Sequence, residues 1–421
     1  MKYEQEYINI LNEELKQAMG CTEPIALAYC ASLAKKYLNK EPQKVDVYCS
    51  GNIIKNVKSV IVPNTNGLRG IESAVSIGII GGKSDLELQC ISKVTNEEIK
   101  LCEEFLKKNI ISVKLSESDY IFDIHIFMYH DNDCVEVRIV DYHTNVILIK
   151  VNDDILLQKK VTGLKSFDLT DRTLLTVEEI YNFVEKVDIN KIKDILFEQI
   201  NCNIAIAEEG MKNNYGANIG KTILSMDPNS LIAKAKAYAA AGSDARMNGC
   251  SMPVVINSGS GNQGMTCSIP VIVYSRELNL GEEKMLRALA LSNLLTTHIK
   301  TDIGRLSAYC GVIAAGCSAG AAISYLYGGG VKEIAHTLVN SLAIASGIIC
   351  DGAKASCAAK IALAVEAGIL GYHMYLNGNQ FKGGDGIVQK GVENTIHNIG
   401  QLASQGMVET DKEIIKIMLK K

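Results

Sequence analysis

The sequence is poor in aromatic residues and has no tryptophan. Aromatic residues make up 6% of its 421 residues, so platforms for stacking single-stranded nucleic acid have little to be built from. No sign of charge dominates, because 43 basic and 47 acidic residues give a net charge of -4 without a block of like charge. This balance argues against a nucleic acid or an acidic membrane surface as the main partner. We therefore expect a small-molecule ligand.

The amino terminus lacks the pattern of a secretory signal. It reads MKYEQEYINILNEELKQ, which is charged and amphipathic rather than basic and then apolar, so we expect a cytoplasmic protein. The stretch from Leu306 to Val331 carries no charge and is long enough to span a bilayer. It is rich in Gly, Ala and Ser but has few large apolar residues, so we predict a buried helix and no membrane partner.

Cysteine, in contrast, is abundant. The cytoplasm keeps thiols reduced, so the 13 cysteines must be explained by metal binding, catalysis or burial rather than by disulfides. Burial is our interpretation of those within apolar patterns, namely Cys30, Cys49, Cys90, Cys102, Cys134, Cys202 and Cys267. Cys21 precedes Pro24 at an expected helix start, where the helix dipole favours thiolate, although an ordinary buried thiol fits equally well.

Hydrophobic periodicity predicts an α+β fold. Between about residues 44 and 164 the pattern alternates and is rich in β-branched residues, whereas the flanking regions have helical periodicity. We predict a mainly helical catalytic domain from residues 1–40 and 170–421, with residues 41–169 inserted as a domain of mixed β-sheet and helices. The predicted strands of the insert include NIIKNVKSVIVP and LELQCIS, and its predicted helices are IESAVSIGIIGG and NEEIKLCEEFLKK.

Two turns are candidate ligand sites. The string from Ser258 to Gly264 matches the G-x-G-x-x-G dinucleotide pattern only weakly, since Pro270 and β-branched residues follow where a helix should run. Its amides, with the side chains of Asn262 and Gln263, could instead hold a carboxylate, and a structural turn is the third reading. The second turn, VPNTNGLRG, is rich in donors, although an ordinary surface loop accounts for it in isolation.

Further cysteines lie in a stretch of small residues between Thr301 and Gly368. Small residues let helices approach closely, so this region should be central in the fold. Cys310 and Cys317 precede the string CDGAKASC, which runs from Cys350 to Cys357. The spacing fits neither zinc ribbons nor ferredoxins, so the pattern alone does not choose among these thiols.

Four strings taken together resemble the iron-sulfur L-cysteine desulfidase family, which is similar to the catalytic chain of iron-sulfur L-serine dehydratases. They are GCTEP from Gly20, SGSGNQG from Ser258, YCG from Tyr309 and CDGAKASC from Cys350. They occur in the same order over nearly the whole chain, which makes the resemblance specific.

The resemblance implies a [4Fe-4S] cluster held by Cys310, Cys350 and Cys357, with one iron open to L-cysteine. Cys317 has no matching role, and Cys21 matches a further motif cysteine that is a base, a resting fourth ligand or neither. The implied reaction is β-elimination of sulfide, giving pyruvate and ammonia. We add Lys354 as a residue that tunes the charge of the site.

Substrate-binding candidates are Asn64, Thr65 and Arg69 from the insert, with Asn262 and Gln263 from the glycine turn. His298 is an alternative base, although a satisfied helix histidine is commoner. Other readings are an L-serine dehydratase, a pyridoxal-phosphate lyase, for which no Schiff-base lysine is evident, and a non-catalytic sensor of cysteine or metal. The sequence is compatible with a homo-oligomer.

Overall fold

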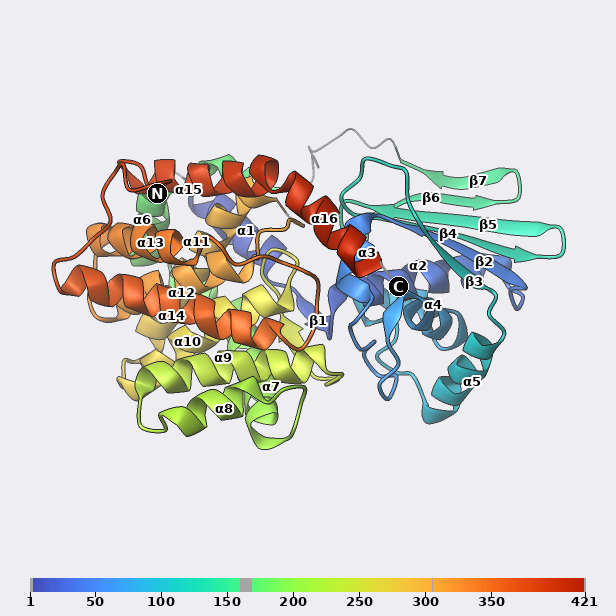
Figure 1. Ribbon diagram of the computed structural model, residues 1–421, viewed down its shortest axis with the longest axis horizontal. Helices are drawn as coiled ribbons and strands as arrows, with labels where there is room; N and C mark the ends of the chain where they lie inside the picture. The colour runs from blue at the N-terminus through green and yellow to red at the C-terminus, as the bar shows by residue number, and fades with distance from the viewer. Residues whose placement is uncertain (1–2, 160–168, 305, 420–421) are drawn as a thin grey trace.

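The computed structural model describes residues 3–159, 169–304 and 306–419. Figure 1 shows helices gathered on one side and a sheet with its own helices on the other, which is an α+β fold as predicted. Each side has its own hydrophobic core.

The helical side is built around α12, in which every residue is buried. Neighbouring helices α10, α11, α13 and α14 surround it. Its helices are α1 (Glu4–Glu14), α6 (Val177–Lys186), α7 (Lys193–Lys212), α8 (Ile219–Met226), α9 (Leu231–Met247), α10 (Gly261–Glu277), α11 (Glu282–Ile303), α12 (Val312–Leu326), α13 (Val331–Ala345), α14 (Cys357–Leu376), α15 (Val392–Gln401) and α16 (Val408–Leu419). Short helical turns are η2 (Arg172–Leu174), η3 (Ile189–Lys191) and η4 (Leu402–Gly406), and β1 (Gln17–Met19) pairs antiparallel with β8 (Pro253–Val255).

The other side is a six-stranded sheet with strand order β3-β2-β4-β5-β6-β7, in which only β2 and β3 are parallel. Alternate residues of β4, such as Ile124, Ile126 and Met128, are buried, as expected for a sheet covered on one face. The strands are β2 (Lys44–Cys49), β3 (Ile111–Leu115), β4 (Asp123–His130), β5 (Asp133–Val140), β6 (Val146–Val151) and β7 (Asp154–Gln158), and the helices are α2 (Thr22–Leu38), α3 (Gly51–Val57), α4 (Gly70–Ile80), η1 (Ser84–Gln89) and α5 (Asn96–Lys107).

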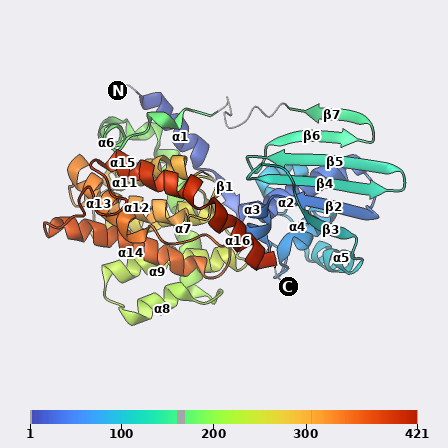
Figure 2. The ribbon, with the colours of Figure 1, turned by 45° about the horizontal axis from the view of Figure 1, so that its top comes forward.

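Helix α2 packs with the sheet rather than with the helical side. It contacts α4, β4 and β5, and its apolar residues belong to the core of the sheet. The predicted boundary near residue 40 therefore differs from the packing, which changes cores between β1 and α2. At the other end of the chain, α16 reaches from the helical side to α3, as Figures 1 and 2 show.

Three predictions of local structure are wrong. The string NIIKNVKSVIVP contains α3, and LELQCIS lies largely in η1, although both were expected to be strands. In α3 the apolar residues Ile53, Ile54 and Val57 follow helical spacing, and Lys55 and Asn56 between them are buried as well. The segment around Pro270 is helix α10, buried over most of its length, so packing outweighs the cost of about 3 kcal/mol for an internal proline.

The small residues of α12 and α14 allow the two backbones to touch. A Cβ atom on Gly320 would lie 2.3 Å from the carbonyl carbon of Gly368, and one on Gly368 would lie 2.2 Å from the carbonyl oxygen of Gly316. The expectation that this region is central in the fold is confirmed. Among the residues that the structure describes, no helix is long and apolar enough to cross a membrane.

This contact predicts that Gly320→Ala lowers the free energy of unfolding by about 1 to 3 kcal/mol, because overpacking forces the helices apart. Urea unfolding followed by circular dichroism measures the change. Gly347→Ala is the matched control, since a Cβ there meets no atom within 4 Å, and should change the value by less than about 0.5 kcal/mol. Equal effects of the two substitutions would contradict the close approach.

Candidate active site

A short backbone ladder brings two of the candidate cysteines together. Residues 308–310, just before α12, pair antiparallel with residues 348–350, just after α13. The amide of Cys310 donates to the carbonyl of Ile348 at 3.1 Å, and the amide of Cys350 donates in the other direction, to residue 308, at 2.6 Å. Two thiols far apart in the sequence therefore lie side by side.

The third cysteine follows on a loop that is pressed against the sheet side. Cys357 is the first residue of α14, and its Sγ donates to the carbonyl of Gly352 at 3.6 Å. Gly352 has φ of 94°, and a Cβ there would lie 2.2 Å from the carbonyl oxygen of Lys55 in α3. Only glycine fits this position, so α3 fixes the loop that carries Cys350 and Cys357.

A cavity of about 100 Å³ lies where these segments meet the sheet side. It is lined by three cysteines of the helical side, by residues at the starts of α2 and α10, and by basic side chains. The lining includes Cys310, Cys350, Cys357, Cys21, Glu23, Asn56, Ser260, Asn262, Gln263, Lys55, Arg246, Lys300 and Lys360.

The three thiols influence one another electrostatically. A hydrogen bond between Cys310 and Cys350 raises the pKa of Cys310 well above its usual value and lowers that of Cys350, on which the charges of Lys55 and Lys354 act in the same direction. Burial raises the pKa of Cys357, and the charge of nearby Cys350 contributes to the increase. The thiols are close enough that negative charge on one is felt by the others.

Buried and partly buried lysines lie around the three thiols. Lys55 is 1% exposed and forms an ion pair with Asp411 of α16, which crosses from the helical side to reach it. Lys360 donates to the carbonyl of Ile349 at 2.8 Å and forms an ion pair with Asp351. Lys300 donates to the carbonyl of Gly304. These cations can offset the charge that bound thiolates would bring.

Cys21 and Glu23 form a hydrogen-bonded pair at the cavity wall. Cys21 is the N-cap residue of α2, as expected, but burial and then the Glu23 carboxylate raise its pKa well above the usual value. The Cys21 thiol donates to Glu23 Oε2 at 3.2 Å, and Asn56 Nδ2 donates to Oε1 at 3.1 Å. The thiol form of Cys21 is therefore favoured, and the Glu23 carboxylate accepts its hydrogen bond.

The glycine turn places Asn262 and Gln263 at the cavity, as the sequence analysis expects. They lie in the first turn of α10, where Ser260 is the N-cap and accepts from the amide of Gln263. The Gln263 side chain packs against Gly311, and its Oε1 is buried without a hydrogen-bond partner in the described part of the chain. A short antiparallel strand, not a βαβ unit, precedes the turn, so the dinucleotide reading has no structural support.

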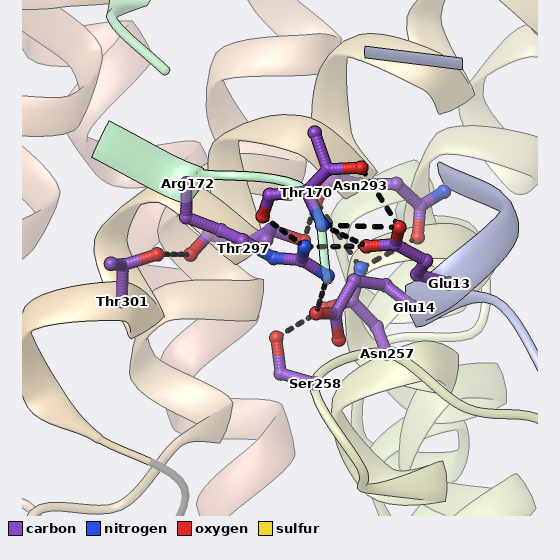
Figure 3. A network of polar contacts seen from close by, with 9 residues as sticks. All are labelled: Glu13, Glu14, Thr170, Arg172, Asn257, Ser258, Asn293, Thr297 and Thr301. Carbon is purple, nitrogen blue, oxygen red and sulfur yellow. Dashed lines mark hydrogen bonds and ion pairs between the residues drawn. The ribbon is translucent and has the colours of Figure 1, made fainter. Parts of the chain in front are cut away.

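A network of polar side chains supports this turn (Figure 3). Ser258, with φ of 49°, donates to Asn257 Oδ1 at 2.8 Å, and Asn257 Nδ2 donates to Asn293 Oδ1 at 3.0 Å. Beside them Arg172 forms ion pairs with Glu13 at 2.5 Å and Glu14 at 2.7 Å. The left-handed backbone at Ser258 is thus fixed by side chains of α11.

Three of the predicted site residues, all from one turn of the sheet side, do not line the cavity. Asn64 Nδ2 donates to the carbonyl of Ile91, Thr65 Oγ1 donates to that of Val62, and Arg69 donates to that of Ser59. These hydrogen bonds hold the turn to backbone carbonyls of the sheet side, and its Pro63 packs against Gly20, where a Cβ would lie 2.0 Å from Pro63 Cγ. The turn therefore packs against the segment that carries Cys21, and its three predicted site residues lie outside the cavity lining.

Lys354 and His298 also lie outside the cavity lining. Lys354 forms an ion pair with Asp351, and its charge lowers the pKa of Cys350 and opposes the effect of burial on the pKa of Cys357, to which its backbone also forms a hydrogen bond. His298 Nε2 is 2.6 Å from Glu393 Oε2. Both residues are held by carboxylates within the chain.

The donor set fits the iron-sulfur cluster that the resemblance implies. Cys310, Cys350 and Cys357 line one cavity, and soft thiolates are the usual ligands of such clusters. Within the described residues no three His, Cys, Asp or Glu side chains lie close enough together to hold one metal ion. The three thiols therefore share a cavity without forming the site of a single metal ion.

Several cavity residues are absent from the predictions. Glu23 lies within the recognised string GCTEP, so its proximity to Cys21 could have identified it. Lys55, Lys360 and Arg246 belong to helices without a recognisable motif. The available signal was a charge within an otherwise apolar or small-residue helix.

Comparison with known proteins identifies the family. The family described as serine dehydratase alpha chain matches residues 85–416. A UPF0597 protein of Desulfitobacterium hafniense is 57% identical over 99% of this chain and 97% of its own length. Those of Finegoldia magna and Treponema denticola are 46% and 45% identical over 99% of this chain, covering 99% and 98% of their own lengths. The chain thus belongs to the serine dehydratase alpha chain family.

Proposed function

We propose that the protein is an L-cysteine desulfidase, which eliminates sulfide from the β-carbon of L-cysteine. The observation that carries this proposal is the convergence of Cys310, Cys350 and Cys357 on one cavity beside Cys21 and Glu23. A [4Fe-4S] cluster on the three thiolates would supply a Lewis-acidic iron with a free position for the substrate thiolate. The affinity of thiolate for iron favours cysteine over serine.

In this proposal Cys21 removes the α-proton. A buried thiol with a raised pKa is a strong base once deprotonated, which suits a poorly acidic C-H bond. Cys21 must lose its own proton before it acts as a base, and the charge of Arg246 favours that loss. Glu23 accepts the thiol hydrogen bond at 3.2 Å and so orients Cys21. The electron pair left on the α-carbon forms the double bond as sulfide leaves, and the aminoacrylate released is hydrolysed to pyruvate and ammonia.

The family description supports a second candidate, the dehydration of L-serine. The same residues would remove the same α-proton, with hydroxide as the leaving group. Anaerobic protein should release sulfide and pyruvate in equal amounts from L-cysteine. Its kcat/KM for L-cysteine should exceed its kcat/KM for L-serine. Coupled pyruvate and sulfide assays decide the case, and pyruvate from serine alone would favour the dehydratase.

For the metal centre we predict that anaerobically purified protein is brown and that Cys350→Ala removes the broad visible absorbance, because a ligand thiolate is lost. Cys317→Ala is the matched control, since Cys317 is buried in α12 away from the cavity lining, and should keep the colour. Iron analysis of the unsubstituted protein finding fewer than about three irons per chain would count against the cluster.

For the base we predict that Cys21→Ser keeps the visible absorbance but loses exchange of the substrate α-proton with deuterated water. A serine hydroxyl is a far weaker acid than a thiol, so it does not supply the anion. Proton NMR of recovered L-cysteine measures the exchange. If the substituted protein still exchanges the proton at the original rate, Cys21 is not the base.

A further inference from the structure

Arg246 is a buried cation at the cavity, and it takes no direct part in the proposed removal of the α-proton or release of sulfide. It lies in the last turn of α9, is 3% exposed and lines the cavity together with Cys21 and the three candidate ligand cysteines. A guanidinium keeps its charge in proteins, so burying it without an anion costs several kcal/mol. An anion close to the guanidinium is therefore expected.

The described residues supply no such anion. Arg246 donates from one terminal nitrogen to Asn262 Oδ1 at 3.2 Å, a neutral acceptor. Its Nε is buried without a hydrogen-bond partner, and no ion pair with a carboxylate is formed in the part of the chain that the structure describes. A guanidinium with open donors in a cavity is suited to a carboxylate ligand, which it binds through two parallel hydrogen bonds.

The neighbouring backbone is shaped to receive this side chain. A Cβ on Gly261 would lie 2.4 Å from Nε of Arg246, so the absence of a side chain there lets the guanidinium lie against the start of α10. The amino terminus of that helix adds a partial positive charge for an anion. Beyond it, the unpartnered Gln263 Oε1 is an acceptor able to bind an ammonium group.

We propose that Arg246 binds the α-carboxylate of the amino-acid substrate, while Gln263 Oε1 accepts a hydrogen bond from its ammonium group. This inference rests on the proposed function only in requiring an α-amino acid, and it holds for cysteine and serine alike. The charge of Arg246 also acts on Cys21, where it opposes the larger effects of burial and Glu23 on the pKa of the thiol. A carboxylate on Arg246 thus brings the α-carbon near Cys21.

The test compares two ligands that need no turnover, measured by calorimetry on the anaerobic holoprotein. 3-Mercaptopropionate keeps the thiol and the carboxylate of cysteine, whereas cysteamine keeps the thiol and the amine. We expect Arg246→Gln to weaken 3-mercaptopropionate about ten- to a hundredfold, the range for a hydrogen bond to a charged group, and to leave cysteamine unchanged. The pair 3-hydroxypropionate and ethanolamine serves if serine proves to be the substrate.

Arg276→Gln is the matched control, because Arg276 lies at the exposed end of α10, and it should change neither affinity. Retained visible absorbance and melting temperature show that the variant is folded; if Arg246→Gln does not fold, Arg246→Lys should give a smaller loss confined to 3-mercaptopropionate. An unchanged affinity for 3-mercaptopropionate, or equal losses for both ligands, would overturn the assignment. Since no arm depends on sulfide release, failure of the desulfidase proposal remains distinguishable.

Discussion

The site depends on one pair of backbone hydrogen bonds. They join the segment before α12 to the segment after α13, and they place Cys310 beside Cys350 although a helical hairpin separates them in the sequence. The buried packing of α12 against α13 and α14 holds both segments in place. Without this ladder, the thiols would have no common cavity.

The sheet side completes what the helical side begins. Gly352 lies directly on the backbone of Lys55, and Cys21 and Glu23 stand at the start of a helix that packs on the sheet. Helix α16 returns from the helical side to hold Lys55 through Asp411. The cavity thus combines thiols from one core with the hydrogen-bonded Cys21 and Glu23 and a buried cation from the other, so its geometry requires both cores to be correctly packed.

The sequence predicts the α+β class and the strings that lie at the cavity. Each string holds its functional groups within a few residues: a cysteine at a helix start, a glycine turn with amides, and a loop with two thiols. The predictions for α3 and α10 are wrong, because burial on most sides stabilises a helix there despite the β-branched residues and the proline. Asn64, Thr65 and Arg69 have suitable donors, but these donate to backbone carbonyls of the sheet side. The sequence does not identify Arg246 as a site residue, because that inference depends on its burial at the cavity without a carboxylate partner in the described part of the fold.

The central claim is that three thiols hold a cluster with one iron free for substrate. Mössbauer spectroscopy of anaerobic protein enriched in iron-57 tests it most directly. The account predicts that one iron differs from the others and that its signal alone shifts when L-cysteine is added. Irons that are all equivalent and unaffected by L-cysteine, or the absence of a cluster signal, would contradict it.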